Sequence, residues 1–138
     1  MKSKAFLILT FFFQNWALAF NPQEHFCRIS GGSFGTIRNS NDQFGICKFG
    51  SSSIDSISFL SKVTQSKTSS AVNALKDFKT CTQANGSLLY FSEVNQLNSG
   101  TSEIFCYFTD GSFVTNHSLT GQLDSQNQDL VRSLELKY

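Results

Sequence analysis

The chain has 138 residues, with 11 basic and 10 acidic side chains, a formal net charge of +1 and 40% hydrophobic residues. A nearly neutral chain without basic runs lacks the positive field that attracts nucleic acid or an anionic membrane surface. Its apolar content, which includes 15 phenylalanines, is too high for a disordered chain and suits one modest core or two very small ones.

Residues 1–19 have the pattern of a cleaved export signal. Two early lysines precede an apolar run over residues 5–13, and residues 17–19 read Ala-Leu-Ala, a small-residue cleavage site. We therefore expect the mature chain to begin at Phe20. The alternative is a membrane anchor, but a helix needs about 20 apolar residues to span a bilayer and this run is shorter.

The predicted mature chain is nearly neutral. Loss of the two signal lysines leaves nine basic residues against 10 acidic ones, a net charge of −1. The first cysteine, Cys27, lies well after the cleavage point, so its position does not predict lipid attachment. We expect a soluble exported protein, periplasmic or extracellular, that is not lipid-anchored.

Four cysteines in an exported chain usually form two disulfides. They are Cys27, Cys47, Cys81 and Cys106. The internal similarity described next favours the pairs Cys27–Cys47 and Cys81–Cys106, each closing a loop of about 20 to 25 residues and stabilising the fold by about 3 kcal/mol. A crossed pairing stays open if the two copies exchange strands. The wide spacings fit no zinc motif, so we expect no metal site and no cofactor.

The chain contains one pattern twice: a helix, a cysteine, a turn, a strand, a loop and a second strand with a cysteine. In the first copy, Asn21-Pro22 begins the helix with Asn as the N-cap, and Gly31-Gly32 ends it. Strands are expected over residues 33–38 and 43–49, joined by a polar loop.

The helix of the second copy is more divergent. Ser69 or Ser70 caps it, and Val72, Leu75 and Phe78 form its apolar stripe.

Strands of the second copy follow Asn85-Gly86, which ends the helical part. They are expected over residues 88–91, 103–108 and 113–118. In the first copy the place of the third strand is residues 50–53, and the spacing of Ile54, Ile57 and Leu60 favours a short helix after it.

These patterns predict an α+β fold made of two repeated units, each an antiparallel β-hairpin covered by a helix and closed by one disulfide. The alternative is that the two small sheets join into one. The first unit spans residues 20–60 and the second residues 71–138, with a polar linker over residues 61–70 and a C-terminal helix within residues 124–138.

The first copy also carries a family pattern. Its motifs are Asn21-Pro22, Phe26-Cys27, Gly31-Gly32, Ile37-Arg38 and Gly45-Ile46-Cys47. Together they resemble a family of small exported domains of unknown function that is labelled haemolysin. The likeness covers residues 21–60, and residues 71–118 match more distantly. The family usually has one copy, a tryptophan after the turn and, in many members, a lipid-attachment cysteine; this chain differs in all three.

The sequence offers no catalytic set. The chain has two histidines, His25 and His117. His117 and Asp110 could form a Ser/His/Asp triad with a serine, but no serine lies in a known nucleophile motif such as G-x-S-x-G. We therefore expect no enzyme activity.

Asn85-Gly86-Ser87 and Asn116-His117-Ser118 are glycosylation acceptors in a eukaryotic secretory route.

Recognition on a rigid scaffold usually lies in its loops. Polar loops are expected at residues 39–42 and 92–102, and the second hairpin is rich in aromatic residues. Strand alternation places Cys106 and Phe108 on the core face and Tyr107 on the other. The candidate binding residues are Tyr107, Asn95, Gln96 and Asn98.

The function predicted from the sequence is an exported, disulfide-stabilised, non-enzymatic binding module, with hydrolase inhibition as one specific form. Its ligand would be a protein or a glycan. The family label implies a membrane-active protein as an alternative, and an envelope structural protein without a soluble ligand is a further one.

Overall fold

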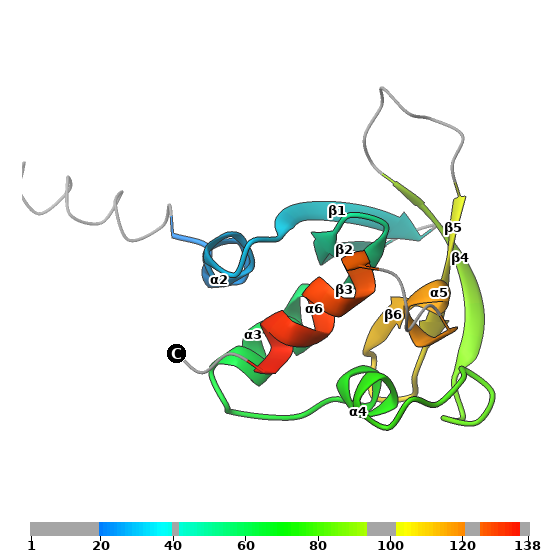
Figure 1. Cartoon of the computed structure of the whole chain (residues 1–138). Helices are drawn as coiled ribbons and strands as arrows, with labels where there is room; N and C mark the ends of the chain where they lie inside the picture. Colours follow the sequence, from blue (N-terminus) through cyan, green and yellow to red (C-terminus); the bar gives the residue numbers. More distant parts are fainter. Residues whose placement is uncertain (1–19, 40–41, 94–101, 121–124, 136–138) are drawn as a thin grey trace, which may run out of the picture.

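The computed structural model describes residues 20–39, 42–93, 102–120 and 125–135 (Figure 1). The fold class is α+β, as predicted, with five helices and six strands in the described residues. In chain order they are α2 (Pro22–Ile29), β1 (Ser33–Asn39), β2 (Asp42–Phe49), β3 (Ser52–Asp55), α3 (Ser56–Val63), α4 (Ser70–Lys76), β4 (Ser87–Glu93), β5 (Ser102–Tyr107), β6 (Phe113–Thr115), α5 (Asn116–Thr120) and α6 (Ser125–Glu135).

The six strands form one closed antiparallel barrel in the order β1-β2-β3-β6-β5-β4. Two three-stranded meanders, β1-β2-β3 and β4-β5-β6, are joined at two seams. At one seam Ile54 of β3 lies opposite Val114 of β6, and at the other Ile37 and Arg38 of β1 pair with the end of β4. The two hairpins therefore do not form separate sheets, and the predicted alternative of one joined sheet is the observed arrangement.

Both predicted disulfides are present. Cys27 is bonded to Cys47 and Cys81 to Cys106, with a Cα–Cα distance of 5.6 Å in each. Each bridge ties the segment before a meander to the middle strand of that meander. The order helix, three strands, helix occurs in both halves, whereas an internal duplication of the sequence stays a prediction.

The predicted helix caps form as expected. The side chain of Asn21 accepts hydrogen bonds from the backbone N–H groups of Gln23 and Glu24, at 3.1 and 3.4 Å, and Pro22 opens α2. Ser69, rather than Ser70, caps α4 through a 3.3 Å bond from the N–H of Val72. These side chains satisfy backbone donors that have no partner within the helix.

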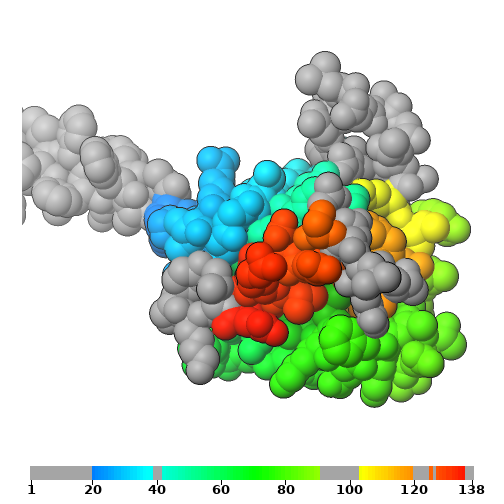
Figure 2. Space-filling model, in the orientation of Figure 1, coloured from blue at the N-terminus to red at the C-terminus, as the bar shows by residue number. Residues whose placement is uncertain are grey.

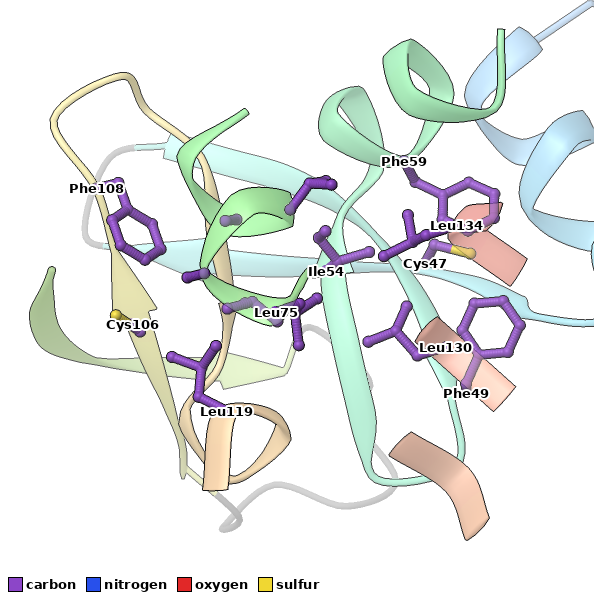
Figure 3. Close-up of a cluster of buried hydrophobic side chains, with 14 of the residues drawn as sticks. Cys47, Phe49, Ile54, Phe59, Leu75, Cys106, Phe108, Leu119, Leu130 and Leu134 are labelled. Carbon is purple, nitrogen blue, oxygen red and sulfur yellow. The ribbon is translucent and has the colours of Figure 1, made fainter. Parts of the chain in front are cut away.

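Apolar side chains fill both faces of the barrel wall. The interior holds Ile37, Ile46, Phe105 and Phe113, with Phe44, Leu89 and Tyr107 packed against them. A larger core lies between the outside of the barrel and the helices. Figure 3 shows Phe49, Phe59, Leu130 and Leu134 gathered around Cys47, Leu119 and Phe108 near Cys106, and Ile54 between the two groups. Where the wall is buried on both sides, the helices and strands stabilise one another.

Several predicted boundaries are wrong, for identifiable reasons. Phe78 was expected in the apolar stripe of α4, but the helix ends at Lys76 and Phe78, with a backbone φ of 53°, is 64% exposed. The strand expected over residues 113–118 ends at Thr115, and α5 begins at Asn116. Residues 61–63 of the predicted linker belong to α3, since Val63 is buried against the helical core.

The predicted helix after the third strand also begins later than expected. β3 extends to Asp55, and α3 starts at Ser56 because the Asp55 side chain is its N-cap. The C-terminal helix is confirmed as α6, with Leu130 and Leu134 buried.

Gly86 is required by the second disulfide. A Cβ at this position would overlap the Sγ of Cys106 and lie 2.9 Å from the Sγ of Cys81. We therefore expect Gly86→Ala to destabilise the oxidised protein by about 2 kcal/mol, measured by chemical denaturation. Gly35→Ala is the matched control, since its Cβ would have no neighbour nearer than 3.7 Å. Equal stability of the two variants would contradict the packing argument.

Candidate functional site

A cleft of about 450 Å³ opens where α3 and α4 begin, and both halves of the chain contribute to it. Its walls come from the start of β2, the end of β3, the first turn of α3, the segment before α4 and the turn between β5 and β6. Among the residues that line the cleft are Gln23, Gln43, Phe44, Asp55, Ile57, Lys67 and Asp110. Ligand sites are usually concave, with apolar walls and a few convergent polar groups, and the cleft has this composition.

Asp55 lies buried at the junction of the two halves. One carboxylate oxygen accepts a 2.8 Å hydrogen bond from the N–H of Ser58, which caps α3, and the other accepts a 3.0 Å bond from the N–H of Phe113 in β6. Burial raises the pKa of Asp55, and the bonds from Phe113 and Ser58 offset only part of this effect. Asp55 therefore both starts a helix and holds the two meanders together.

Thr115 makes the corresponding bond from the other meander. Its hydroxyl accepts from the N–H of Ser53 at 2.8 Å and donates to the carbonyl of Ser53 at 3.1 Å. Asp55 and Thr115 thus flank the single pair of opposed residues, Ile54 and Val114, that joins β3 to β6. Backbone pairing between β3 and β6 is limited to this one pair of residues. The side-chain hydrogen bonds of Asp55 and Thr115 lengthen the contact between the two strands.

Asp110 has a different environment at the mouth of the cleft. Its carboxylate accepts from the N–H of Ser70 at 2.8 Å and from the N–H and hydroxyl of Ser112 at 3.0 and 2.6 Å. Burial alone would raise the pKa of Asp110, but the bonds from Ser112 and Ser70 prevail and lower it to about 2. Asp110 is therefore ionised at neutral pH and fixes the start of α4 against the turn between β5 and β6.

The remaining lining combines apolar surface with amide and hydroxyl groups. The ring of Phe44 packs edge-on against Phe113, with centroids 5.8 Å apart, and the side chain of Ile57 is 65% exposed. Gln23 accepts a hydrogen bond from the hydroxyl of Ser56, and Gln43 and Lys67 are exposed. Such a surface can hold a polar ligand through hydrogen bonds and cover its apolar side.

Groups for catalysis are scarce in this cleft. Its described lining includes neither histidine nor cysteine. Both carboxylates already accept hydrogen bonds on each of their oxygens from groups that set helix starts and strand contacts. In the described part of the chain, no three His, Cys, Asp or Glu side chains are grouped to hold a metal ion.

Of the candidate binding residues predicted from the sequence, the structure describes Tyr107, which lies elsewhere. Tyr107 is half-buried in the barrel interior, where its ring stacks on Phe113 at 6.5 Å between centroids, and it does not line the cleft. Cys106 and Phe108 are buried on the opposite face, as the alternation predicted. Asn95, Gln96 and Asn98 lie outside the described residues.

The two histidines also lie outside the cleft. His117, on α5, is within 3.3 Å of the hydroxyl of Ser52, while Asp110 contacts Ser70 and Ser112. His25 is an exposed residue of α2 whose ring contacts Phe20 and Phe26.

From the sequence, Asp110 was considered as a partner of His117, and Asp55 was not singled out. Both have a local signal, since Asp55 directly precedes Ser-Ile-Ser, an N-cap context, and Asp110 begins an Asp-Gly-Ser turn. These local signals do not identify the distant residues that the two carboxylates bond. Phe113 is 58 residues from Asp55, and Ser70 is 40 residues from Asp110.

Comparisons with protein-family models, with curated proteins and with solved structures found no match to this chain. The likeness to the family labelled haemolysin therefore stays a prediction. Within the described residues, no helix has the length and apolar character needed to cross a membrane.

Replacing Asp110 with Asn is expected to weaken the fold in a pH-dependent manner. The pKa of this carboxyl is lowered from 3.8 to about 2 by folding, so its stabilisation is complete above pH 3.8 and is lost as the pH falls through 2. Because the carboxyl is largely exposed, solvent screening keeps the effect below about 2 kcal/mol.

Urea unfolding from neutral pH down to pH 2 measures this effect: the wild type should lose more stability across this range than Asp110→Asn. Asp77→Asn, at the exposed end of α4, controls for loss of a carboxylate that does not bond Ser70 or Ser112. Parallel curves for wild type and Asp110→Asn would contradict the role given to this residue.

Proposed function

We propose that the chain is an exported, disulfide-stabilised and non-enzymatic binding module whose ligand enters the cleft at the start of α3 and α4. The observation that carries this proposal is the cleft itself, about 450 Å³ in volume and built from both meanders. The hydrogen bonds of Asp55 and Asp110 hold its walls, and one disulfide crosslinks each of the two meanders that contribute to it. A rigid wall favours binding, because little conformational entropy is lost when a ligand enters.

A neutral glycan has the chemistry that suits this cleft best. Its hydroxyl groups would exchange hydrogen bonds with Gln23 and Gln43, while the apolar face of a sugar ring would lie against Phe44 and Ile57. The lining carries charges of both signs, on Lys67 and on the ionised Asp110, so it offers a charged glycan no net attraction. Of the two ligand classes predicted from the sequence, the lining favours the glycan.

A binding role without turnover follows from how the carboxylates are used. A glycosidase needs one carboxylic acid to protonate the leaving group and a second carboxylate to act as base or nucleophile. Asp55 and Asp110 instead accept backbone hydrogen bonds that set the starts of α3 and α4. If either carboxylate gave up these hydrogen bonds to act in catalysis, the helix start that it holds would be disrupted. We therefore propose that the bound glycan is not hydrolysed.

Hydrolase inhibition is a narrower form of the same proposal. An exported hydrolase that acts on the bound glycan would be inhibited when the module covers its substrate. This inhibition would disappear in a variant that no longer binds the glycan, which separates it from direct contact with the enzyme.

Binding of the mature chain to an array of neutral and anionic glycans tests the proposal. We expect neutral glycans to bind, and Gln43→Ala to weaken the best of them at least about fivefold through loss of hydrogen bonds. Gln128→Ala, an exposed amide on α6 outside the cleft, should bind like the wild type. Products of hydrolysis should not appear on prolonged incubation.

Two results would count against the proposal. If the folded, oxidised protein bound no glycan on the array, glycans would be excluded as its ligands. If Gln43→Ala and Gln128→Ala weakened glycan binding equally, the cleft would be excluded as the binding site.

A further inference from the structure

Although the barrel is closed, one of its strands has a described neighbour on only one side along most of its length. β4 pairs with β5 over its length, from Ser87 opposite Tyr107 to Ser92 opposite Ser102. On its other side, among the described residues, β4 pairs with β1 only at Ser92 and Glu93. In Figure 1, β4 lies at the right-hand margin of the molecule, and Figure 2 shows the same margin at the surface. The backbone of residues 87–90 is therefore placed to accept another strand.

The outer face beside this edge is apolar and exposed. Leu88 is 54% exposed and Tyr90 70%, and Ile104 of β5, directly opposite Tyr90, is 38% exposed. Three of the large apolar residues that the protein exposes thus lie together on one hairpin. Contiguous patches of this kind usually mark an interaction surface.

Features that normally protect an edge strand are missing here. Natural sheets keep open edges apart with lysines, prolines, bulges or very short strands. Residues 87–90 read Ser-Leu-Leu-Tyr, without a charge or a proline, and belong to a strand of seven residues. This edge is therefore suited to strand addition.

We propose that the occupant of this edge is a second copy of the chain, so that two β4 strands pair antiparallel around a twofold axis at Leu89. In this register Leu88 of each copy lies opposite Tyr90 of the other. The two outer patches then form one continuous apolar surface, which extends on both sides to Ile104.

The absence of charge favours a second copy over other partners. A twofold axis brings each residue near its own equivalent in the other copy, so a charged edge would repel itself. Leu88, Leu89, Tyr90 and Ile104 bear no charge. The dimer would carry two clefts, and a ligand with several glycan units would be held by both at once. The dimer itself does not depend on glycan binding.

The test is sedimentation velocity of the oxidised mature chain over a concentration series. We expect a monomer–dimer equilibrium, because a strand contact over residues 88–90 with three apolar side chains per copy is small for a permanent interface. Tyr90→Lys should weaken the dimer at least about tenfold by placing a charge against Leu88. Ile57→Lys, at an equally exposed position on α3, should dimerise like the wild type.

A mixing experiment tests the register. Leu88→Glu and Tyr90→Lys should each be mainly monomeric alone, because each places an unpaired charge in the contact. Mixed in equal amounts they should form a heterodimer, since Glu at 88 then faces Lys at 90 while the second Leu–Tyr pair stays intact. Thermal unfolding of each variant confirms that the barrel is folded.

Three outcomes would overturn the inference. A wild type that is monomeric at every concentration removes the second copy as occupant. A dimer that Tyr90→Lys and Ile57→Lys affect equally lies elsewhere on the surface. Failure of the two variants to combine on mixing excludes the proposed register. Each readout is independent of glycan binding, so failure here leaves the proposed function untouched.

Discussion

The fold depends on how the two meanders are joined between β3 and β6. Only Ile54 and Val114 lie opposite each other there as a strand pair, and a contact of one pair is weak by itself. The side chains of Asp55 and Thr115 extend it by bonding the backbone of the opposite meander. One of the two seams of the barrel and the position of α3 therefore depend on these two polar side chains.

The same join produces the cleft. Asp55 must reach Phe113 and also cap α3, so the start of α3 is held beside the turn that carries Asp110. Asp110 in turn holds the start of α4. The starts of α3 and α4 are thereby brought to one cleft by residues that also stabilise the fold. Structural use of the carboxylates also limits their chemistry, because every oxygen is already bonded.

Much of the local structure was predictable from the sequence, because its signals are local. The cap at Asn21, the turns at Gly31-Gly32 and Asn85-Gly86, and the alternation around Cys106 depend on neighbours within a few residues. The disulfide pairing followed from the similarity of the halves. Barrel closure was not predictable, since it rests on contacts between residues about 60 positions apart.

The placement of Tyr107 and Phe78 shows where local reasoning fails. Alternation correctly put Tyr107 and Cys106 on opposite faces of the strand. In an open hairpin the face that carries Tyr107 would be in solvent, whereas in a closed barrel it is not. In the barrel that face becomes an interior, so Tyr107 packs on Phe113. Phe78 continues the helical spacing of Val72 and Leu75, yet the chain leaves the helix before reaching it. Periodicity gives no information on where the tertiary structure ends a helix.

An asymmetry between the halves explains why one hairpin has an exposed outer face. On the first hairpin, α2 packs against β1, and α3 and α6 pack against β2. Phe34, on the outer face of β1, is accordingly half-buried against the helical core. Leu88 follows Gly86 as Phe34 follows Gly32, but α4 ends early and α6 lies over the other meander, so Leu88 and Tyr90 stay exposed. The β4 side of the second hairpin thus lacks a helical cover, and pairing between two copies would bury the β4 edge and part of the apolar surface that is left in water.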